Sequence, residues 1–139
     1  MRIRPLPPPG RACARMIGAV GTDAFAPMLK DSLARAGVDV SGVAEVPGPS
    51  GKALIFLEIS GQNRIVVVPD ANAFLEPVRV ERAVLTLETP RETAVMVQNE
   101  IPREAVMVAI RAAHLRGWPT VWNVAHRRRC RLRCFALAK

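Results

Sequence analysis

The sequence predicts an α/β fold in which helices pack on a layer of β-strands and a separate β-hairpin is appended. Strand-like and helix-like periodicities alternate along residues 16–125, and strand, helix, strand is the pattern of a right-handed βαβ unit. The second observation is a pair of β-rich runs joined by a short polar segment, which is typical of a hairpin. Together they indicate an α/β layer with a β appendage.

The first part of this pattern is a strand, a helix and a second extended segment. Residues 16–20 form a short apolar run, after which Thr22 or Asp23 can cap a helix that ends at Gly37. Residues 38–46 are a plausible strand or extended connection. The helix is expected to bury one apolar face, made of Phe25, Met28, Leu29 and Leu33.

The hairpin is the clearest local signal in the chain. Residues 51–59 and 64–68 are β-rich, and the polar residues 60–63 between them favour a tight turn. Both faces are apolar, because Leu54 and Phe56 alternate with Ile55 and Leu57. We therefore expect the hairpin to be covered by the body of the fold, by a partner subunit, or by both.

The rest of the core again alternates helix and strand. A helix begins near Pro77, residues 94–97 form an apolar strand, a second helix runs from Pro102 to Gly117, and residues 120–124 form the last strand. The apolar positions at helical spacing are Val80, Val84 and Leu87 in the first helix, and Val106, Ile110, Ala113 and His114 in the second.

Charge divides the chain into three parts. The net charge is +8, yet residues 1–15 carry four arginines and no acid, and residues 126–139 carry five arginines, one lysine and no acid. Residues 16–125 hold 10 basic and 12 acidic residues, an ordinary surface balance. We therefore expect a disordered Pro/Arg-rich arm over 1–15, a folded domain over 16–125, and a disordered basic tail over 126–139.

Length and hydropathy narrow the class further. At 139 residues and 15.1 kDa the chain suits one domain, and 50% hydrophobic residues are enough to build a core. No apolar run approaches the roughly 20 residues that a membrane span needs, and the arginines and prolines at the start do not suit a secretory signal. The expected location is the cytoplasm.

Several motifs then point to one family by their order and spacing. The segments are Met-Ile-Gly-Ala-Val-Gly-Thr-Asp-Ala-Phe (16–25), Gly-Val-Asp (37–39), Gly-Lys-Ala-Leu-Ile (51–55), Gln-Asn-Arg-Ile-Val-Val-Val-Pro (62–69), Ala-Asn (71–72), Gln-Asn-Glu-Ile-Pro (98–102) and Asn-Val-Ala (123–125). With these segments in this order, the chain resembles the ribokinases, of the PfkB-type carbohydrate kinases, over about residues 16–125.

The resemblance implies part of a doubly wound parallel sheet with a β lid over residues 51–68 that covers a sugar and often forms a homodimer. It implies that Glu100 hydrogen-bonds a ribose hydroxyl and that Ala53 lies near the sugar. Asn123 matches the start of the family's Asn-Pro-Ala-Pro segment, although Val124 replaces the first proline. These three residues, Glu100, Ala53 and Asn123, are the expected substrate-binding residues.

The resemblance also implies what this chain does not match. The family's first strand, with its sugar-binding Asp, and its Gly-Gly-Lys-Gly-Ala-Asn segment are expected before Met16, where the proline-rich arm stands. The nucleotide-binding half and the Gly-Ala-Gly-Asp motif with the catalytic base are not matched either. ATP and Mg²⁺ are therefore cofactors by resemblance only, no catalytic residue is assigned, and we expect this chain alone to be inactive as a kinase.

Two other patterns in the chain partly match a phosphate-binding loop and a zinc site. Gly48, Gly51 and Lys52 resemble a phosphate loop, but Val46 and Ala53 stand where that pattern needs glycine and Ser or Thr. The spacing of a histidine and two cysteines at 126, 130 and 134 could suit zinc, but no fourth ligand is evident, so no metal site is expected. The alternative function is a binding module whose basic tail contacts nucleic acid or anionic surfaces.

Overall fold

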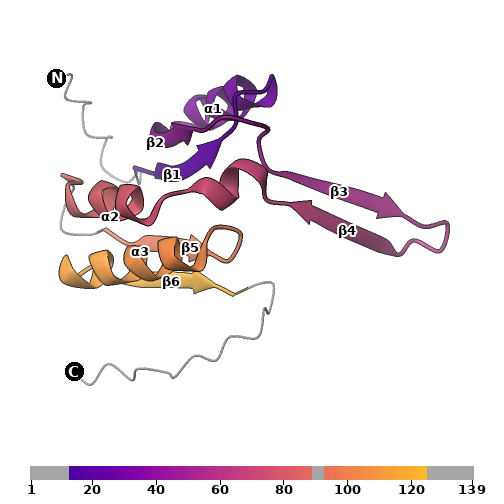
Figure 1. Ribbon diagram of the computed structural model, residues 1–139. Coiled ribbons are helices and arrows are strands. Elements are labelled where there is room, and N and C mark those ends of the chain that lie inside the picture. Colours follow the sequence, from indigo (N-terminus) through magenta and orange to yellow (C-terminus); the bar gives the residue numbers. More distant parts are fainter. Residues whose placement is uncertain (1–12, 89–92, 125–139) are drawn as a thin grey trace.

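The computed structural model describes residues 13–88 and 93–124, and it shows an α/β body from which a hairpin projects (Figure 1). The elements follow in the order β1 (Arg15–Val20), α1 (Phe25–Arg35), β2 (Asp39–Glu45), β3 (Lys52–Leu57), β4 (Asn63–Val68), the 3₁₀ helix η1 (Asp70–Phe74), α2 (Pro77–Leu85), β5 (Val95–Gln98), α3 (Arg103–Leu115) and β6 (Thr120–Asn123). The predicted strands and helices are all present, whereas η1 was not predicted.

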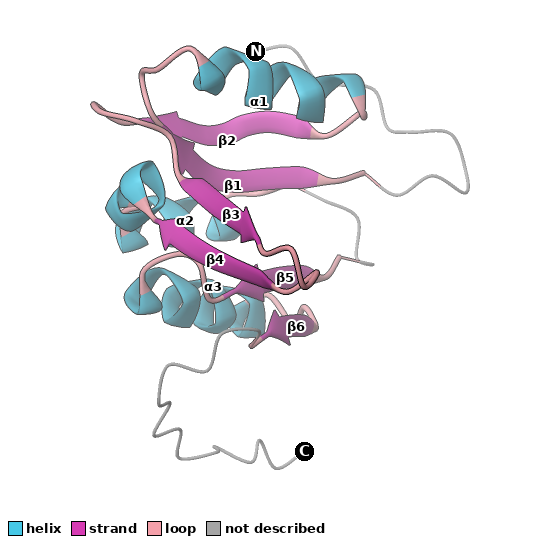
Figure 2. Cartoon of the chain, turned by 90° about the vertical axis from the view of Figure 1, so that its right-hand side faces the viewer, coloured by secondary structure: helices cyan, strands magenta, loops and turns pink. Residues whose placement is uncertain are grey.

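The strands of the body form two parallel pairs. β1 pairs with β2, with Gly18 opposite Val43, and β5 pairs with β6, with Val97 opposite Trp122. Each pair is connected through one helix, α1 or α3, so the body contains two βαβ units. Figure 2 shows the four strands in the spatial order β2, β1, β5, β6, with the hairpin in front of them.

The core lies between these strands and the helices α2 and α3. α2 begins at Pro77, whose fixed φ suits the first helical turn, and it buries Val80 and Val84 as predicted. α3 is rich in alanine, which allows close approach to α2 and to β5, and it buries five side chains. Those five are Ala105, Val106, Ala109, Ala112 and Ala113. His114, which follows the buried Ala113, is exposed because it lies on the solvent side of the helix.

α1 differs from the prediction in what it buries. Phe25, Met28 and Leu29 were expected to form its buried face, but they are 54%, 54% and 43% exposed, and the one buried residue of the helix is Ala26. The physical reason is that α1 packs on β2 at the edge of the body, so no second layer covers the remaining apolar side chains.

The hairpin was expected to be covered by the body, by a partner subunit, or by both, and the structure excludes the body. β3 and β4 pair in antiparallel register with Ile55 opposite Ile65, and their side chains are exposed on both faces, with Leu57 77% exposed. The turn consists of residues 58–62 rather than 60–63, because Glu58 N–H donates to the Gln62 carbonyl and Gly61 takes a φ of 82°. The body therefore leaves both hairpin faces uncovered.

Candidate functional site

The carboxyl ends of β5 and β6 bring two of the predicted substrate-binding residues to one edge of the body. Asn123 is the last residue of β6 and pairs with Gln98, the last residue of β5. Glu100 follows two residues later, in the turn that leads into α3, and its side chain is exposed, as is that of Asn123. This is the edge at which open α/β sheets bind their ligands, so both side chains are placed to contact one.

A hydrogen bond that sequence reasoning missed connects these two strand ends. The Trp122 indole Nε1–H donates to Asn99 Oδ1 at 3.0 Å, in a partly buried position. Trp122 precedes Asn123 and Asn99 precedes Glu100, so one contact restrains the backbone beside both candidate residues. The sequence did contain one signal for this contact, a tryptophan followed by an asparagine at a strand end. A partly buried indole N–H usually has an acceptor, so a nearby acceptor could have been expected.

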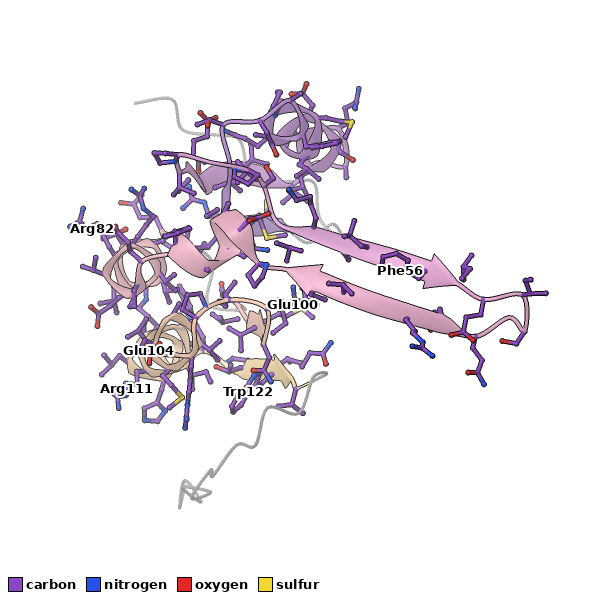
Figure 3. The ribbon with its side chains drawn as sticks, turned by 45° about the vertical axis from the view of Figure 1, so that its right-hand side comes forward. Phe56, Arg82, Glu100, Glu104, Arg111 and Trp122 are labelled. Carbon is purple, nitrogen blue, oxygen red and sulfur yellow. The ribbon has the colours of Figure 1, made fainter. Side chains whose placement is uncertain are left out.

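The hairpin projects from the same end of the body, as Figure 3 shows with Glu100 and Trp122 on the side from which β3 and β4 extend. Ala53, the third predicted substrate-binding residue, lies near the base of β3 opposite Val67 and is exposed. Because side chains alternate along a strand, Ala53 shares its face with Ile55. The structure thus places Ala53 on the hairpin and the other two residues on the body.

The base of the hairpin is held by close backbone contacts. A Cβ on Gly51 would lie 2.5 Å from Asn72 Nδ2 and 2.8 Å from the Pro69 carbonyl oxygen, so no larger residue fits there without movement. Asp70 follows Pro69 with a φ of 42°, in the left-handed region that favours glycine and that aspartate tolerates. The Lys52 Nζ pairs with Asp70 Oδ2 at 3.2 Å across this base.

A polar network anchors the segment that leads into the hairpin. The Ser50 side chain is buried; its backbone N–H and its hydroxyl each donate to Asp23 at 2.8 Å, and its hydroxyl oxygen accepts from Gly21 N–H at 3.0 Å. The hydrogen bonds from the Ser50 backbone and hydroxyl lower the pKa of Asp23 below its usual value. Asp23 Oδ1 also accepts from Ala26 N–H in the first turn of α1 at 3.2 Å; the sequence offered Thr22 or Asp23 as the cap, whereas the residue at the N-cap position is Ala24.

The other two carboxylates with lowered pKa values lie on β2 and are paired. Burial works to raise the pKa of Asp39, but hydrogen bonds from Ser41 and Arg15 outweigh it and lower that pKa. The Lys30 ammonium donates to Glu45 at 2.8 Å and lowers the pKa of that carboxyl. Both are ion pairs on the strand far from Glu100 in the sheet order, so they stabilise the α1 side of the body.

A cavity of about 460 Å³ lies away from this edge. It is lined by residues of β2 and the segment after it, the segment from η1 into α2, and the start of α3, including Val46, Phe74 and Glu104. Neither Glu100, Ala53 nor Asn123 lines it. The histidine and cysteines at 126, 130 and 134 lie outside the described residues, as do residues 1–12 of the arm (1–15) and the whole tail (126–139).

Comparison with known proteins identifies what this arrangement is similar to. A model described as pfkB family carbohydrate kinase matches residues 10–134. A ribokinase from fission yeast, Schizosaccharomyces pombe, is 34% identical over 111 residues, which cover 79% of this chain and 34% of that protein.

Solved structures agree with the sequence comparison. The ribokinase of Giardia lamblia is similar with a TM-score of 0.67 and 29% identity, over 84% of this chain and 36% of that one. The ribokinase of Arabidopsis thaliana, solved with ribose and ATP, is similar with a TM-score of 0.65 and 25% identity, over 83% of this chain and 38% of that one. The α/β fold class with parallel strands and the resemblance drawn from the motifs are both confirmed. The chain spans about a third of the length of these relatives.

Proposed function

The chain belongs to the pfkB family of carbohydrate kinases, and on that basis we propose that it forms the sugar-contacting part of a ribokinase-type enzyme. The observation that carries this proposal is the shared position of Glu100 and Asn123 at the carboxyl ends of β5 and β6, beside an exposed hairpin. Glu100 accepts a hydrogen bond from a sugar hydroxyl, Asn123 borders the same site, and Ala53 on the hairpin covers the sugar. The substrate is ribose or a related sugar.

The glycine-containing segment before β3 gives no support for a site for the nucleotide that the reaction needs. A triphosphate is commonly held by a glycine-rich loop at a helix N-terminus. Here Gly48 and Gly51 lead into the strand β3, and Lys52 is paired with Asp70. Among the described residues no group of three or more acidic, His or Cys side chains could hold a metal ion. We therefore derive no step through ATP or Mg²⁺, and we expect the chain alone to bind sugar weakly without phosphorylating it.

Two measurements on the purified chain test this proposal. Saturation-transfer NMR should detect ribose on the chain, with the signal reduced by Glu100→Gln and unchanged by Glu104→Gln, a matched exposed glutamate in the first turn of α3. A coupled assay for ADP should show no ribose-dependent turnover. Robust turnover would refute the expected inactivity, and equal ribose signals for the two variants would remove Glu100 from the site.

The hairpin supports a further part of this proposal, a homodimer. If the face with Ala53 and Ile55 covers the sugar, the opposite face with Leu54, Phe56 and Val66 is left for a second copy. Light scattering should then show a dimer that Phe56→Asp converts to a monomer. Leu57→Asp, on the sugar-covering face of the same strand, should leave the dimer intact. A monomeric parent chain, or loss of the dimer in both variants, would contradict this assignment.

The second candidate function is charge-driven binding by the basic tail. The observation that favours it is the concentration of five arginines and one lysine in residues 126–139, without an acid to offset them. Binding to a mixed-sequence duplex DNA should then weaken steeply between about 50 and 200 mM salt and vanish when residues 126–139 are deleted. Binding that survives the deletion would exclude this function.

No helix among the described residues is long and apolar enough to cross a membrane.

A further inference from the structure

The free edge of strand β3 is a feature of the hairpin that sugar binding does not use. Within residues 13–88 and 93–124, β3 forms a ladder with β4 alone, so its other side carries unpaired backbone donors and acceptors. Natural proteins usually blunt such an edge with a charge, a proline or a β-bulge, because it can pair with another chain. Residues 53–57 contain no charge and no proline, and their register with β4 is regular. The edge of β3 is therefore unprotected.

The turn of the hairpin shows which backbone groups this edge presents. The Glu58 N–H donates to the Gln62 carbonyl oxygen, so the backbone groups of Glu58 point towards the returning strand. Hydrogen-bonded and non-hydrogen-bonded residues alternate along an antiparallel strand. The even-numbered residues of β3 therefore bond to β4, and the odd-numbered residues direct their N–H and C=O groups outwards. These outward groups belong to Ala53, Ile55 and Leu57.

A second uncovered surface lies on the same side of the hairpin as β3. Figures 1 and 2 both show β3, and not β4, as the strand nearer to α1. The Ser50 hydroxyl, just before β3, donates to Asp23 at 2.8 Å, and Asp23 accepts from Ala26 N–H in the first turn of α1. The exposed apolar face of α1, which begins at Phe25, is thus held beside the base of β3.

The tip of the hairpin carries an exposed apolar side chain. Ile59 lies in the turn between the strands and is fully exposed. The charge next to it is already paired, since Glu58 Oε1 lies 2.9 Å from Arg64 Nε. The tip therefore presents an isoleucine in a locally neutral surface, and its burial against another apolar surface is favourable.

We propose that the β3 strands of two copies of this chain pair edge to edge and antiparallel, so that one four-stranded sheet runs across the dimer. The inference rests on the homodimer proposed above and specifies the surface that holds it. In a two-fold symmetric pair centred on Ile55, each Ile55 bonds to Ile55 of the second copy, and Ala53 bonds to Leu57 of the second copy. Leu54 then lies opposite Phe56 of the second copy, in a non-hydrogen-bonded pair with close side chains.

The same register carries the tip of one copy to α1 of the other. Two residues beyond its Leu57, Ile59 of the second copy lies beside Gly51, at the base of β3. The exposed apolar face of α1 begins here with Phe25 and continues with Met28, whose flexible side chain adapts to an irregular contact. Because the two-fold axis repeats every contact, one arrangement covers both β3 edges, both tips and both α1 faces.

Two proline variants of the full chain separate edge pairing from contact between hairpin faces. Ile55→Pro removes an outward N–H of β3 and keeps the hydrogen bonds between β3 and β4, as a proline on an edge strand can. Ile65→Pro is the matched control, because Ile65 lies opposite Ile55, on the same face, with its N–H on the outer edge of β4. Sedimentation equilibrium should show a dimer Kd at least tenfold higher for Ile55→Pro and unchanged for Ile65→Pro. Amide exchange in β3 and β4 checks that both variants keep the hairpin.

Cysteine trapping measures the register without a proline. Leu54→Cys and Phe56→Cys are made as separate variants, in a background in which Cys13, Cys130 and Cys134 are replaced by serine. A mixture of the two variants should form an intermolecular disulfide at least tenfold faster than either variant alone. The reason is that the pairing sets residue 54 opposite residue 56, within the distance that a disulfide spans.

Aspartate variants test the contact between the tip and α1. Ile59→Asp and Phe25→Asp should each raise the dimer Kd at least tenfold, and an acid in the first turn of a helix is compatible with folding. Leu115→Asp, at an exposed position of α3, should leave the Kd unchanged. An unchanged Kd for Ile59→Asp or Phe25→Asp would overturn this contact.

The outcomes also separate the edge pairing from the proposed function. A dimer that responds equally to both prolines, or a cysteine mixture no faster than its components, overturns the edge pairing and leaves the homodimer standing. A monomeric parent chain overturns the homodimer and the edge pairing together. The ribose signal of the parent chain tests the sugar site independently of either result.

Discussion

The two βαβ units of the body have the same topology but differ in how much their helices bury. α3 buries five residues, with Ala113 fully inaccessible, whereas α1 buries Ala26 alone and leaves Phe25 and Met28 more than half exposed. α3 lies between α2 and the strands β5 and β6, while α1 meets one edge strand. The burial of helix side chains therefore depends on the number of layers around the helix, not on the apolar content of the helix.

The α1 unit buries few helix side chains, and contacts outside α1 hold it in place. Gly21 lies against the backbone of residues 48–50, and Asp23 accepts hydrogen bonds from Ser50. In the α3 unit a similar contact is made just after α3 by Arg116, which donates to the carbonyl oxygens of Leu85 and Leu87. Its guanidinium carbon also lies 4.2 Å from the centre of the Trp118 ring. Polar and backbone contacts therefore fix both units, and the second unit is held in addition by the packing of α3.

The largest expected effect tests the packing side of this comparison. Leu75, which is 2% exposed, belongs to the core cluster with Ala105 and Ala109, so Leu75→Ala should lower the free energy of unfolding by about 2–5 kcal/mol. Phe25→Ala on α1 removes a larger but exposed side chain and should change it by less than about 0.5 kcal/mol. Chemical denaturation measures the free energy of unfolding of both variants. Equal decreases would contradict the difference in packing between the core and α1.

The next effect tests the anchor of the α1 unit. Gly21→Ala would place a Cβ on the backbone of Gly48, Pro49 and Ser50, and we expect the resulting displacement to cost about 1–3 kcal/mol. Gly18→Ala is the matched control on β1, the strand that Gly21 directly follows, because open space surrounds the Cβ position of Gly18. Thermal unfolding of the two variants should differ clearly, and a neutral Gly21→Ala would show that this contact does not fix the unit.

A smaller effect is expected at the end of the α3 unit. Trp122→Phe keeps the ring but removes the hydrogen bond to Asn99, which should cost about 0.5–1.5 kcal/mol and loosen the turn that carries Glu100. Amide exchange at residues 99–101 should increase in this variant. Val121→Ala, at an exposed position of the same strand, should leave that exchange unchanged, and a similar increase there would contradict a specific role for the indole.

The smallest effect is a dependence of stability on pH. Because hydrogen bonds from Ser50 lower the pKa of Asp23 in the folded chain, its ionised form stabilises the fold above the unfolded pKa of about 4. This contribution is lost as the pH falls through the lower folded pKa. Asp23→Asn should therefore be less stable than the parent at pH 7, with the difference narrowing towards pH 3. A difference that does not vary with pH would rule out this linkage.

The sequence predicted most of the local structure but not which apolar surfaces are buried. Pro77 and Gly37 marked helix ends, and the periodicity located Val80, Val84 and Val106 in the core. The same periodicity failed for Phe25, and it could not say whether the body covers the hairpin, since it reports which residues share a face and not whether another element covers that face. Coverage depends on neighbours distant in the sequence.

The candidate site shows a similar division. Glu100 and Asn123 could be placed at one edge from the sequence, because Glu100 follows β5, Asn123 lies at the end of β6, and the parallel strands of one βαβ unit end at the same edge. The Trp122 to Asn99 hydrogen bond and the Ser50 to Asp23 network could not, because each joins side chains 23 or more residues apart. Their geometry depends on the strand register and on the close contact at Gly21, neither of which the residue pattern encodes.

A chimera tests the central claim, that this chain supplies the sugar-contacting edge of a ribokinase-type kinase, most directly. Residues 16–124 would replace the matching segment of the S. pombe ribokinase, which provides the remaining two-thirds of the fold. We predict ribose phosphorylation by the chimera, a fall in kcat/KM of about 10- to 100-fold with Glu100→Gln, and no change with Glu104→Gln. An active chimera that is indifferent to Glu100→Gln, or equally impaired by both substitutions, would contradict the claim.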